Sequence, residues 1–196
     1  NEPVGTMVLD IGGGTTDIAV LSLGGPVASK SSQVAGDRFN ENIIDYVRSE
    51  FQLAIGEKTA EEVKMAIGAV LPLPETLSRP VRGRDLATGL PREIILTDEH
   101  VREALSASLD KLMEAMKEVI ELTPPELLSD VLERGVTVFG GGALLRGLPE
   151  LLSKMLGVPV YVATDPLTAV VRGTGIVVED PRLWNNTFLD EDAILT

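Results

Sequence analysis

The order of apolar and polar positions along the chain predicts three consecutive strands near its start. Apolar and branched residues at 7–11, 17–23 and 26–34 are separated by glycine clusters, which is typical of a β-meander. Apolar positions at helical spacing begin near Asp37 and predict a helix that ends near residue 51. The first strand is therefore followed by a second strand and not by a helix.

The middle of the chain has the pattern of a small α+β lobe. Thr59 and Glu62 stand at capping-box spacing, which predicts a helix that starts there and is ended by Pro72 and Pro74. Two extended runs, 80–86 and 92–97, flank a turn signal and predict a β-hairpin. We expect residues 56–97 to form a lobe inserted into the rest of the chain.

Helices and short strands alternate in the last part of the chain. A long amphipathic helix is predicted over 98–122, and a second helix begins after Thr123 and ends at Gly135. A strand at 136–139, a helix near 148–156, a strand at 160–163 and a helix capped by Asp165 and Pro166 follow. This alternation predicts an α/β fold.

Composition narrows the classes of function. The 196 residues include 17 Lys and Arg against 30 Asp and Glu, a net charge of −13, which disfavours binding to nucleic acid and to anionic lipid. The absence of cysteine excludes disulfides, thiolate metal sites and a cysteine nucleophile, and it is compatible with a reducing cytoplasm, where we expect the protein to lie. A single histidine, His100, excludes a metal site with several histidines in one chain.

The first glycine cluster stands at the tip of the predicted first hairpin. Glycines allow backbone N–H groups to approach an oxyanion, and Thr15 and Thr16 add hydroxyl donors. Asp10, at the end of the strand, could hold a hydrated Mg²⁺ or orient a water molecule. No lysine and no helix follow, so the cluster is neither a P-loop nor a dinucleotide fingerprint. The alternative is a structural glycine hairpin, which the flanking polar residues disfavour.

Two further candidates are weaker. The second glycine cluster, 140–142, joins a strand to a helix, where glycine serves either close approach to a ligand or packing. Glu61 and Lys64 lie three residues apart on a predicted helix and therefore share a face. They could recognise a polar ring and a sugar, or they could form a solvated ion pair.

Taken together, these segments resemble the C-terminal half of the MreB family of bacterial actins, within the actin-like ATPase superfamily. The resemblance covers about residues 1–178, with Asp17 where the family more often has Glu. It is carried by DIGGGTTD (10–17), VAGD (34–37), AIGEKTAEEVK (54–64), TPPELLSDVLERG (123–135), FGGGALLRG (139–147) and DPLTAVVRGTG (165–175).

The resemblance implies an α/β fold of the actin-like, ribonuclease H-like kind, with a mixed sheet, flanking helices and a small inserted α+β lobe. The main subdomain (IIA) would comprise residues 1–55 and 98–180, the inserted subdomain (IIB) residues 56–97, and a tail residues 181–196.

It also implies a site for ATP and Mg²⁺. Asp10 would contact the metal through water or place the attacking water, and Thr15 would share in catalysis. Ribose and adenine would contact the helix that bears Glu61. The expected nucleotide-binding residues are Gly12, Gly13, Gly14, Thr15, Thr16, Gly36, Glu61, Glu62, Lys64, Gly140, Gly141, Gly142 and Ala143.

The family polymerises into filaments and directs rod cell shape by organising cell-wall synthesis. Its site lies between two similar halves, and this sequence has one such phosphate hairpin, so we expect a nucleotide-binding half with negligible turnover of its own. Expected partners are other copies in a filament and the missing N-terminal half. Contacts with the inner face of the cell membrane and the cell-wall machinery would need the full-length protein, and no nucleic acid is expected. The alternatives are a non-catalytic actin-like interaction module, or half of another superfamily ATPase or kinase.

Overall fold

The main sheet has five strands and joins the beginning of the chain to its last third. The structure is a computed structural model that describes residues 4–179, so the predicted tail at 181–196 lies outside the described residues. The sheet order is β3-β2-β1-β7-β8. Its strands are β1 (Thr6–Ile11), β2 (Thr16–Ser22), β3 (Gly25–Ser32), β7 (Val136–Phe139) and β8 (Val160–Val162). The predicted meander is confirmed.

Strand β1 lies in the middle of this sheet and decides the geometry of the site. It pairs antiparallel with β2 and parallel with β7, so the sheet is mixed. The register places Asp10 opposite both Asp17 on β2 and Phe139 on β7. Because a glycine cluster follows Asp10 in the chain and another follows Phe139, the two clusters emerge at the same edge of the sheet.

Helices cover the main sheet, and their buried side chains form the hydrophobic core together with those of the strands. The predicted long helix is confirmed as α3 (Asp98–Leu122), which packs on β2 and β3, and α4 (Pro125–Arg134) packs on β1. Alternate residues of β1 are fully buried, as expected for a strand covered by helices: Met7, Leu9 and Ile11. Pro125 occupies the first turn of α4 and Gly135 ends it, both as predicted.

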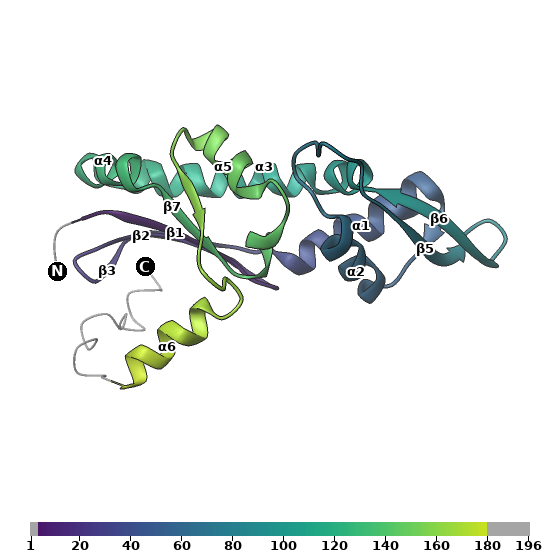
Figure 1. Cartoon of the computed structure of the whole chain (residues 1–196), viewed down its shortest axis with the longest axis horizontal. Coiled ribbons are helices and arrows are strands. Elements are labelled where there is room, and N and C mark those ends of the chain that lie inside the picture. The colour runs from purple at the N-terminus through teal and green to yellow at the C-terminus, as the bar shows by residue number, and fades with distance from the viewer. Residues whose placement is uncertain (1–3, 180–196) are drawn as a thin grey trace.

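The middle of the chain forms a second sheet, far from β3 along the long axis of the molecule (Figure 1). Its order is β4-β5-β6, and the predicted hairpin is confirmed as β5 (Ser78–Asp85) and β6 (Pro91–Thr97). The third strand, β4 (Leu53–Ala54), was not predicted because it is only two residues long. The division into subdomains stays a prediction, and β4 lies on the main-subdomain side of its boundary at residue 55.

Helix α1 (Gly36–Phe51) connects the two sheets, and α2 (Glu57–Ile67) follows between β4 and β5. The predicted limits of α2 are wrong at both ends. The helix begins after Gly56 with no side-chain cap, so Thr59 lies inside its first turn. It ends at Ile67 with Gly68 as its C-cap, well before Pro72. A Cβ at Gly68 would lie closer than 3.0 Å to the carbonyl oxygen of Lys64.

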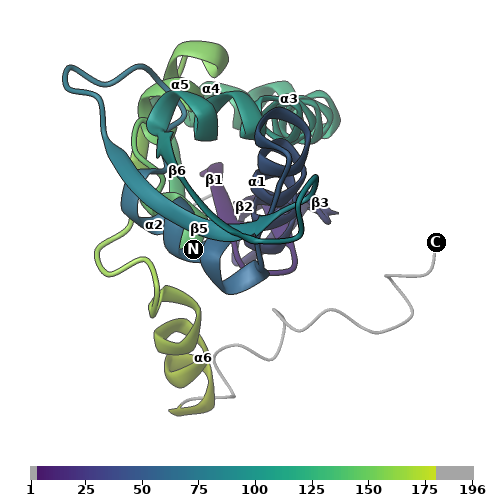
Figure 2. The same cartoon turned by 90° about the vertical axis from the view of Figure 1, so that its right-hand side faces the viewer.

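The last third contains α5 (Leu148–Leu156), as predicted, and α6 (Ala169–Glu179). Asp165 does not cap α6, because the helix starts only at Ala169, four residues after it. Helix α6 projects from the rest of the molecule (Figures 1 and 2), and none of its residues is buried. Within residues 4–179, no helix has the length and apolar character needed to cross a bilayer.

Candidate functional site

The tip of the β1–β2 hairpin is held against the start of α1. The amide of Gly36 donates to the carbonyl of Gly12 (3.0 Å), and the amide of Asp37 donates to that of Gly13 (2.8 Å). A trans peptide sets each carbonyl opposite the next N–H, so the amides of Gly13 and Gly14 point away from the start of α1. This arrangement fixes the hairpin and leaves backbone donors for a ligand.

The second glycine cluster packs on the end of β1. Gly140 has a φ of 83°, and a Cβ there would lie closer than 3.0 Å to the Ile11 carbonyl oxygen and the Asp10 carboxylate. A Cβ on Gly142 would overlap the side chain of Ile11. The cluster runs into a 3₁₀ turn, η1 (Gly141–Leu144), before the predicted helix α5 begins. Glycine at 140 and 142 therefore allows η1 to lie directly against the first glycine cluster.

Helix α2 forms a wall above the two clusters. The ammonium group of Lys64 donates to the Gly36 carbonyl (3.0 Å) and pairs with the Glu61 carboxylate (2.6 Å). Only 12% of the Lys64 side chain is exposed, against 41% of the Glu61 side chain, so the ion pair is half-buried at the wall of the site. Partial burial raises the pKa of Glu61, but hydrogen bonds from Lys64 and Asn40 and the charge of Lys64 outweigh it and lower the pKa overall.

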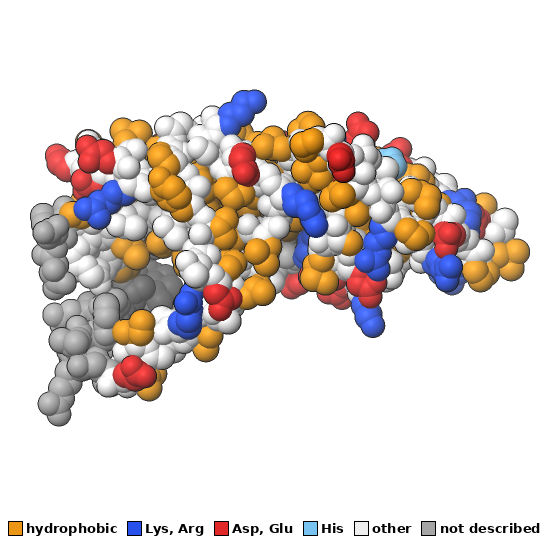
Figure 3. Space-filling model, in the orientation of Figure 1, with side chains coloured by type: hydrophobic (Ala, Val, Ile, Leu, Met, Phe, Trp, Pro, Cys, Tyr) orange, Lys and Arg blue, Asp and Glu red, His pale blue; other side chains and the backbone are white. Residues whose placement is uncertain are grey.

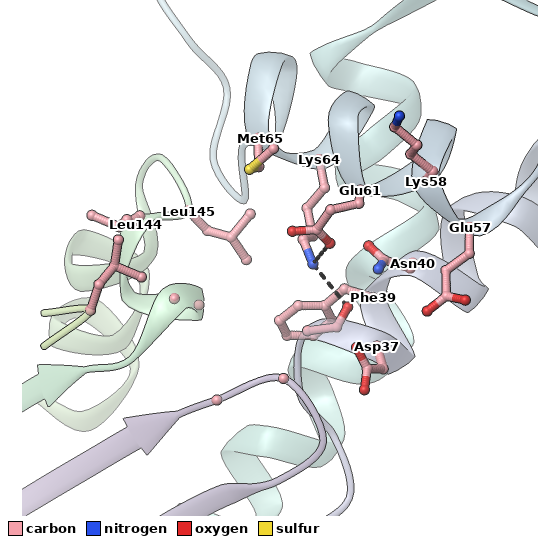
Figure 4. Close-up of a pocket in the computed structure, with 16 residues that line it drawn as sticks. Asp37, Phe39, Asn40, Glu57, Lys58, Glu61, Lys64, Met65, Leu144 and Leu145 are labelled. Atoms are coloured by element: carbon pink, nitrogen blue, oxygen red, sulfur yellow. Dashed lines mark hydrogen bonds and ion pairs between the residues drawn. The ribbon is translucent and has the colours of Figure 1, made fainter. Parts of the chain in front are cut away.

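A cavity of about 820 Å³ lies between the two glycine clusters and α2 (Figure 4). That volume lies in the range of sites for small ligands and cofactors. Glycines and charged groups line one part of it, and apolar side chains line another. The lining residues are Gly12, Gly13, Gly36, Asp37, Phe39, Asn40, Glu57, Lys58, Glu61, Lys64, Met65, Gly141, Gly142, Leu144, Leu145 and Leu167.

The cavity brings together about half of the residues expected to bind the ligand. Those that line it are Gly12, Gly13, Gly36, Glu61, Lys64, Gly141 and Gly142. Gly14 and Thr15 line a neighbouring hollow of about 540 Å³ instead. The Asp10 carboxylate lies against Gly140, at the end of β1, and does not line the cavity itself.

Three side chains point elsewhere and correct the predicted site. Thr16 is fully buried, and its hydroxyl donates to the Val34 carbonyl (2.6 Å), so it cannot also face a phosphate. Glu62 pairs with Arg79 (2.6 Å) on the side of α2 away from the cavity lining. Ala143 is buried in the hydrophobic core and does not line this cavity.

Several lining residues were not predicted. Phe39 and Asn40 follow Gly36 by about one turn of α1, and Met65 follows Glu61 by one turn of α2, so helical spacing from predicted residues was the available signal. Leu144, Leu145 and Leu167 come from turns whose position depends on the packing of η1. No local sequence pattern could have placed those three.

Comparison with known proteins places the chain in a family. A model of the MreB/Mbl protein family matches residues 1–186. The chain belongs to the MreB/Mbl family. It is 48% identical over 179 residues to the cell shape-determining protein Mbl of Bacillus subtilis, and 50% identical over 179 residues to the cell shape-determining protein MreB of Escherichia coli. These alignments cover 91% of this chain but 54% and 52% of the relatives, so it spans about half of their length.

Solved structures show the same fold. MreB5 of Spiroplasma citri bound to AMPPNP superposes with a TM-score of 0.89 at 40% identity, over 94% of this chain and 55% of that one. A double helical filament of MamK superposes with a TM-score of 0.78 at 26% identity, over 89% of this chain and 54% of that one. The predicted actin-like α/β fold is confirmed.

Asp10 lies at the end of β1, against Gly140 of the second glycine cluster. Burial, and secondarily the charge of Asp17, raises the pKa of Asp10 above its ordinary value. Residues 4–179 contain no cluster of three or more acidic or histidine side chains able to hold a metal ion. A Mg²⁺ held by Asp10 through water and completed by ligand phosphates fits this donor set, because magnesium is commonly bound by one or two carboxylates with phosphates.

The raised pKa of Asp10 predicts that Asp10→Asn stabilises the chain. The unfolded chain ionises Asp10 at a lower pH than the folded chain, so the ionised carboxylate disfavours folding above the folded-state pKa. Urea unfolding at pH 7 should give a higher free energy of unfolding for Asp10→Asn than for the native chain. The difference should vanish as the pH falls below the ordinary aspartate pKa of 3.8, and a destabilised Asp10→Asn at pH 7 would contradict this account.

Thr16 and Thr15 offer a matched test of the corrected site. Thr16→Val leaves the buried Val34 carbonyl without its donor and should cost about 1–3 kcal/mol of unfolding free energy. Thr15 is exposed, and its hydroxyl contacts only the exposed Asp17 carboxylate (3.2 Å), so Thr15→Val should change stability by less than about 0.5 kcal/mol. Equal losses of unfolding free energy in the two variants, measured by thermal unfolding, would show that the Thr16 hydrogen bond stabilises the fold less than predicted.

Proposed function

We propose that this chain is the C-terminal, nucleotide-binding half of an MreB/Mbl-family ATPase. The observation that carries the proposal is the strand register, which sets two glycine clusters and the Lys64–Glu61 wall around one cavity. Structures of MreB5 from Spiroplasma citri bound to AMPPNP and to ADP, both at 40% identity, support it. ATP is the expected nucleotide.

Each wall of the cavity suits one part of a nucleotide. Phosphates would lie at the glycine hairpin, where the backbone N–H groups of Gly13 and Gly14 point away from α1 and can donate without a Cβ in the way. Lys64 adds a positive charge near them and is itself fixed by the Gly36 carbonyl. The base would contact the apolar side formed by Leu144 and Leu145, opposite the polar groups (Figure 4).

Hydrolysis would be an in-line attack of water on the γ-phosphate. Magnesium, when bound, would neutralise charge on the phosphates. Asp10 would hold its water ligands or orient the attacking water, and its raised pKa lies in the direction that makes a carboxylate a better proton acceptor. The chain spans about half of its relatives, so the remaining phosphate contacts would come from the other half.

The full protein would polymerise and direct rod cell shape by organising cell-wall synthesis at the inner face of the cell membrane. The relatives named as cell shape-determining proteins and the MamK filament support this. Figure 3 shows separate hydrophobic side chains on the projecting helix α6, and their exposure also supports a further covering part of the protein. They are Val170, Val171, Ile176 and Val178.

Calorimetric titration of the chain with ADP and AMPPNP, in the presence of Mg²⁺, tests the proposal. We expect weak binding by the chain and tighter binding when the N-terminal half is added in trans. No binding under either condition would favour a non-catalytic interaction module. Mg²⁺-dependent ATP hydrolysis by the chain alone, abolished by Asp10→Ala, would contradict the half-site account.

A further inference from the structure

Asn40 places a buried amide at the wall of the cavity. It lies on α1 one turn after Gly36, its side chain lines the cavity, and only 3% of the residue is exposed. Its hydrogen bond to Glu61 helps to lower the pKa of that carboxylate. The side-chain oxygen Oδ1, however, has no hydrogen-bond partner within the described part of the chain.

An unpartnered buried amide oxygen is unusual and needs a reason. Most buried polar atoms in native proteins are hydrogen-bonded, and leaving one unpaired costs about 1–3 kcal/mol. Asn42, two residues later, has ordinary pairing: its side-chain nitrogen donates to the Ser108 hydroxyl (2.6 Å). The difference between the two asparagines suggests that the partner of Asn40 is a ligand.

The position of Asn40 in the cavity identifies the part of a nucleotide that it would meet. Figure 4 shows Leu144 and Leu145 on one side of the cavity and Asn40 on the opposite side, with Glu61 and Lys64 between them. If the base lies on the apolar side and the phosphates lie at the glycine hairpin, the corner with Asn40 and Glu61 remains for the sugar. Both side chains are suited to hydroxyl groups, because each presents a hydrogen-bond acceptor.

We propose that Asn40 binds a sugar hydroxyl of the nucleotide and makes the site select ribose over deoxyribose. The proposal rests on the proposed function and extends it to a residue and a substrate class. A hydroxyl both donates and accepts, so it pairs with the Asn40 amide in either orientation of that group. A site that pairs its buried polar groups with a substrate hydroxyl rejects the analogue that lacks it, since those groups are then left unpaired.

The test compares ADP with 2′-deoxy-ADP and 3′-deoxy-ADP in calorimetric titrations with Mg²⁺. For the native chain, one of the two analogues should bind about tenfold or more weakly than ADP. Asn40→Leu keeps the size of the side chain without its polar atoms. In this variant the ratio of the dissociation constants for that analogue and for ADP should fall close to one. In the matched control Asn42→Leu, which loses a polar group on the same helix, discrimination should be unchanged.

The outcomes separate the two proposals. If ADP binds but neither analogue is weaker, or if Asn40→Leu keeps full discrimination, the role of Asn40 is wrong and nucleotide binding stands. If ADP does not bind at all, the proposed function fails and this inference falls with it. If Asn40→Leu does not fold, an NMR titration of the native chain replaces it. The side-chain amide resonances of Asn40 should shift on addition of ADP and not on addition of the rejected analogue. Equal shifts with both nucleotides would overturn the proposal.

Discussion

Gly140→Ala is expected to lower the free energy of unfolding by about 3 kcal/mol or more. Two effects add at this position. Gly140 has φ 83° and ψ 171°, a backbone conformation that is essentially restricted to glycine. The new Cβ would also lie closer than 3.0 Å to the Ile11 carbonyl and the Asp10 carboxylate, so β1 and η1 would have to separate.

Gly157→Ala is the matched control for that prediction. Gly157 also has a positive φ (72°), but a Cβ there would have no atom within 4 Å. The control should therefore cost only about 1–2 kcal/mol, the strain of left-handed backbone for an L-residue. Urea unfolding of both variants measures the difference. Equal losses would mean that the contact between the two glycine clusters adds nothing beyond backbone strain.

Lys64→Met is expected to reduce nucleotide affinity by at least about tenfold, which corresponds to about 1.4 kcal/mol. Methionine keeps most of the length of the side chain but removes its charge. The Gly36 carbonyl would lose its donor and Glu61 would lose its counter-charge, both at the wall of the cavity. The affinity loss should therefore exceed what the removal of one surface charge produces.

Lys58→Met measures that surface effect. Lys58 lines the same cavity from the same helix, but it is exposed. Its removal should weaken binding of AMPPNP by about threefold or less and should weaken it less at higher salt, since exposed charges are screened. Calorimetric measurement of the AMPPNP affinity of both variants at two salt concentrations distinguishes the roles of the two lysines. A Lys64→Met variant that binds like Lys58→Met would show that the Lys64 contact with Gly36 does not shape the site.

Local patterns predicted the strands because glycine clusters and branched residues are local signals. The pairing of β1 with β7 joins residues about 130 positions apart, so no local pattern could place Gly140 against Asp10. Thr16 was predictable and was misassigned: it shares the alternating face of Ile18 and Val20, both buried, so strand periodicity already places it inside.

The errors in α2 have a different physical cause. The capping-box spacing at Thr59 is only a local signal, and the helix begins earlier, after Gly56. Glu62 was expected at the site because its helix resembles the nucleotide-binding wall of the family, but successive side chains of a helix point about 100° apart. Its partner Arg79 comes from β5, so tertiary packing decided which of the two glutamates faces the cavity.

The most direct test of the central claim is a backbone amide NMR titration of the chain with Mg²⁺ and AMPPNP. If the cavity between the glycine clusters is a nucleotide site, the largest shifts will fall on the hairpin at 12–14, on Gly36, on Glu61 and Lys64, and on η1. The amides of α4 and of the β5–β6 hairpin, which do not line the cavity, should stay unchanged. Saturable shifts confined to those distant elements, or none at all, would contradict the account.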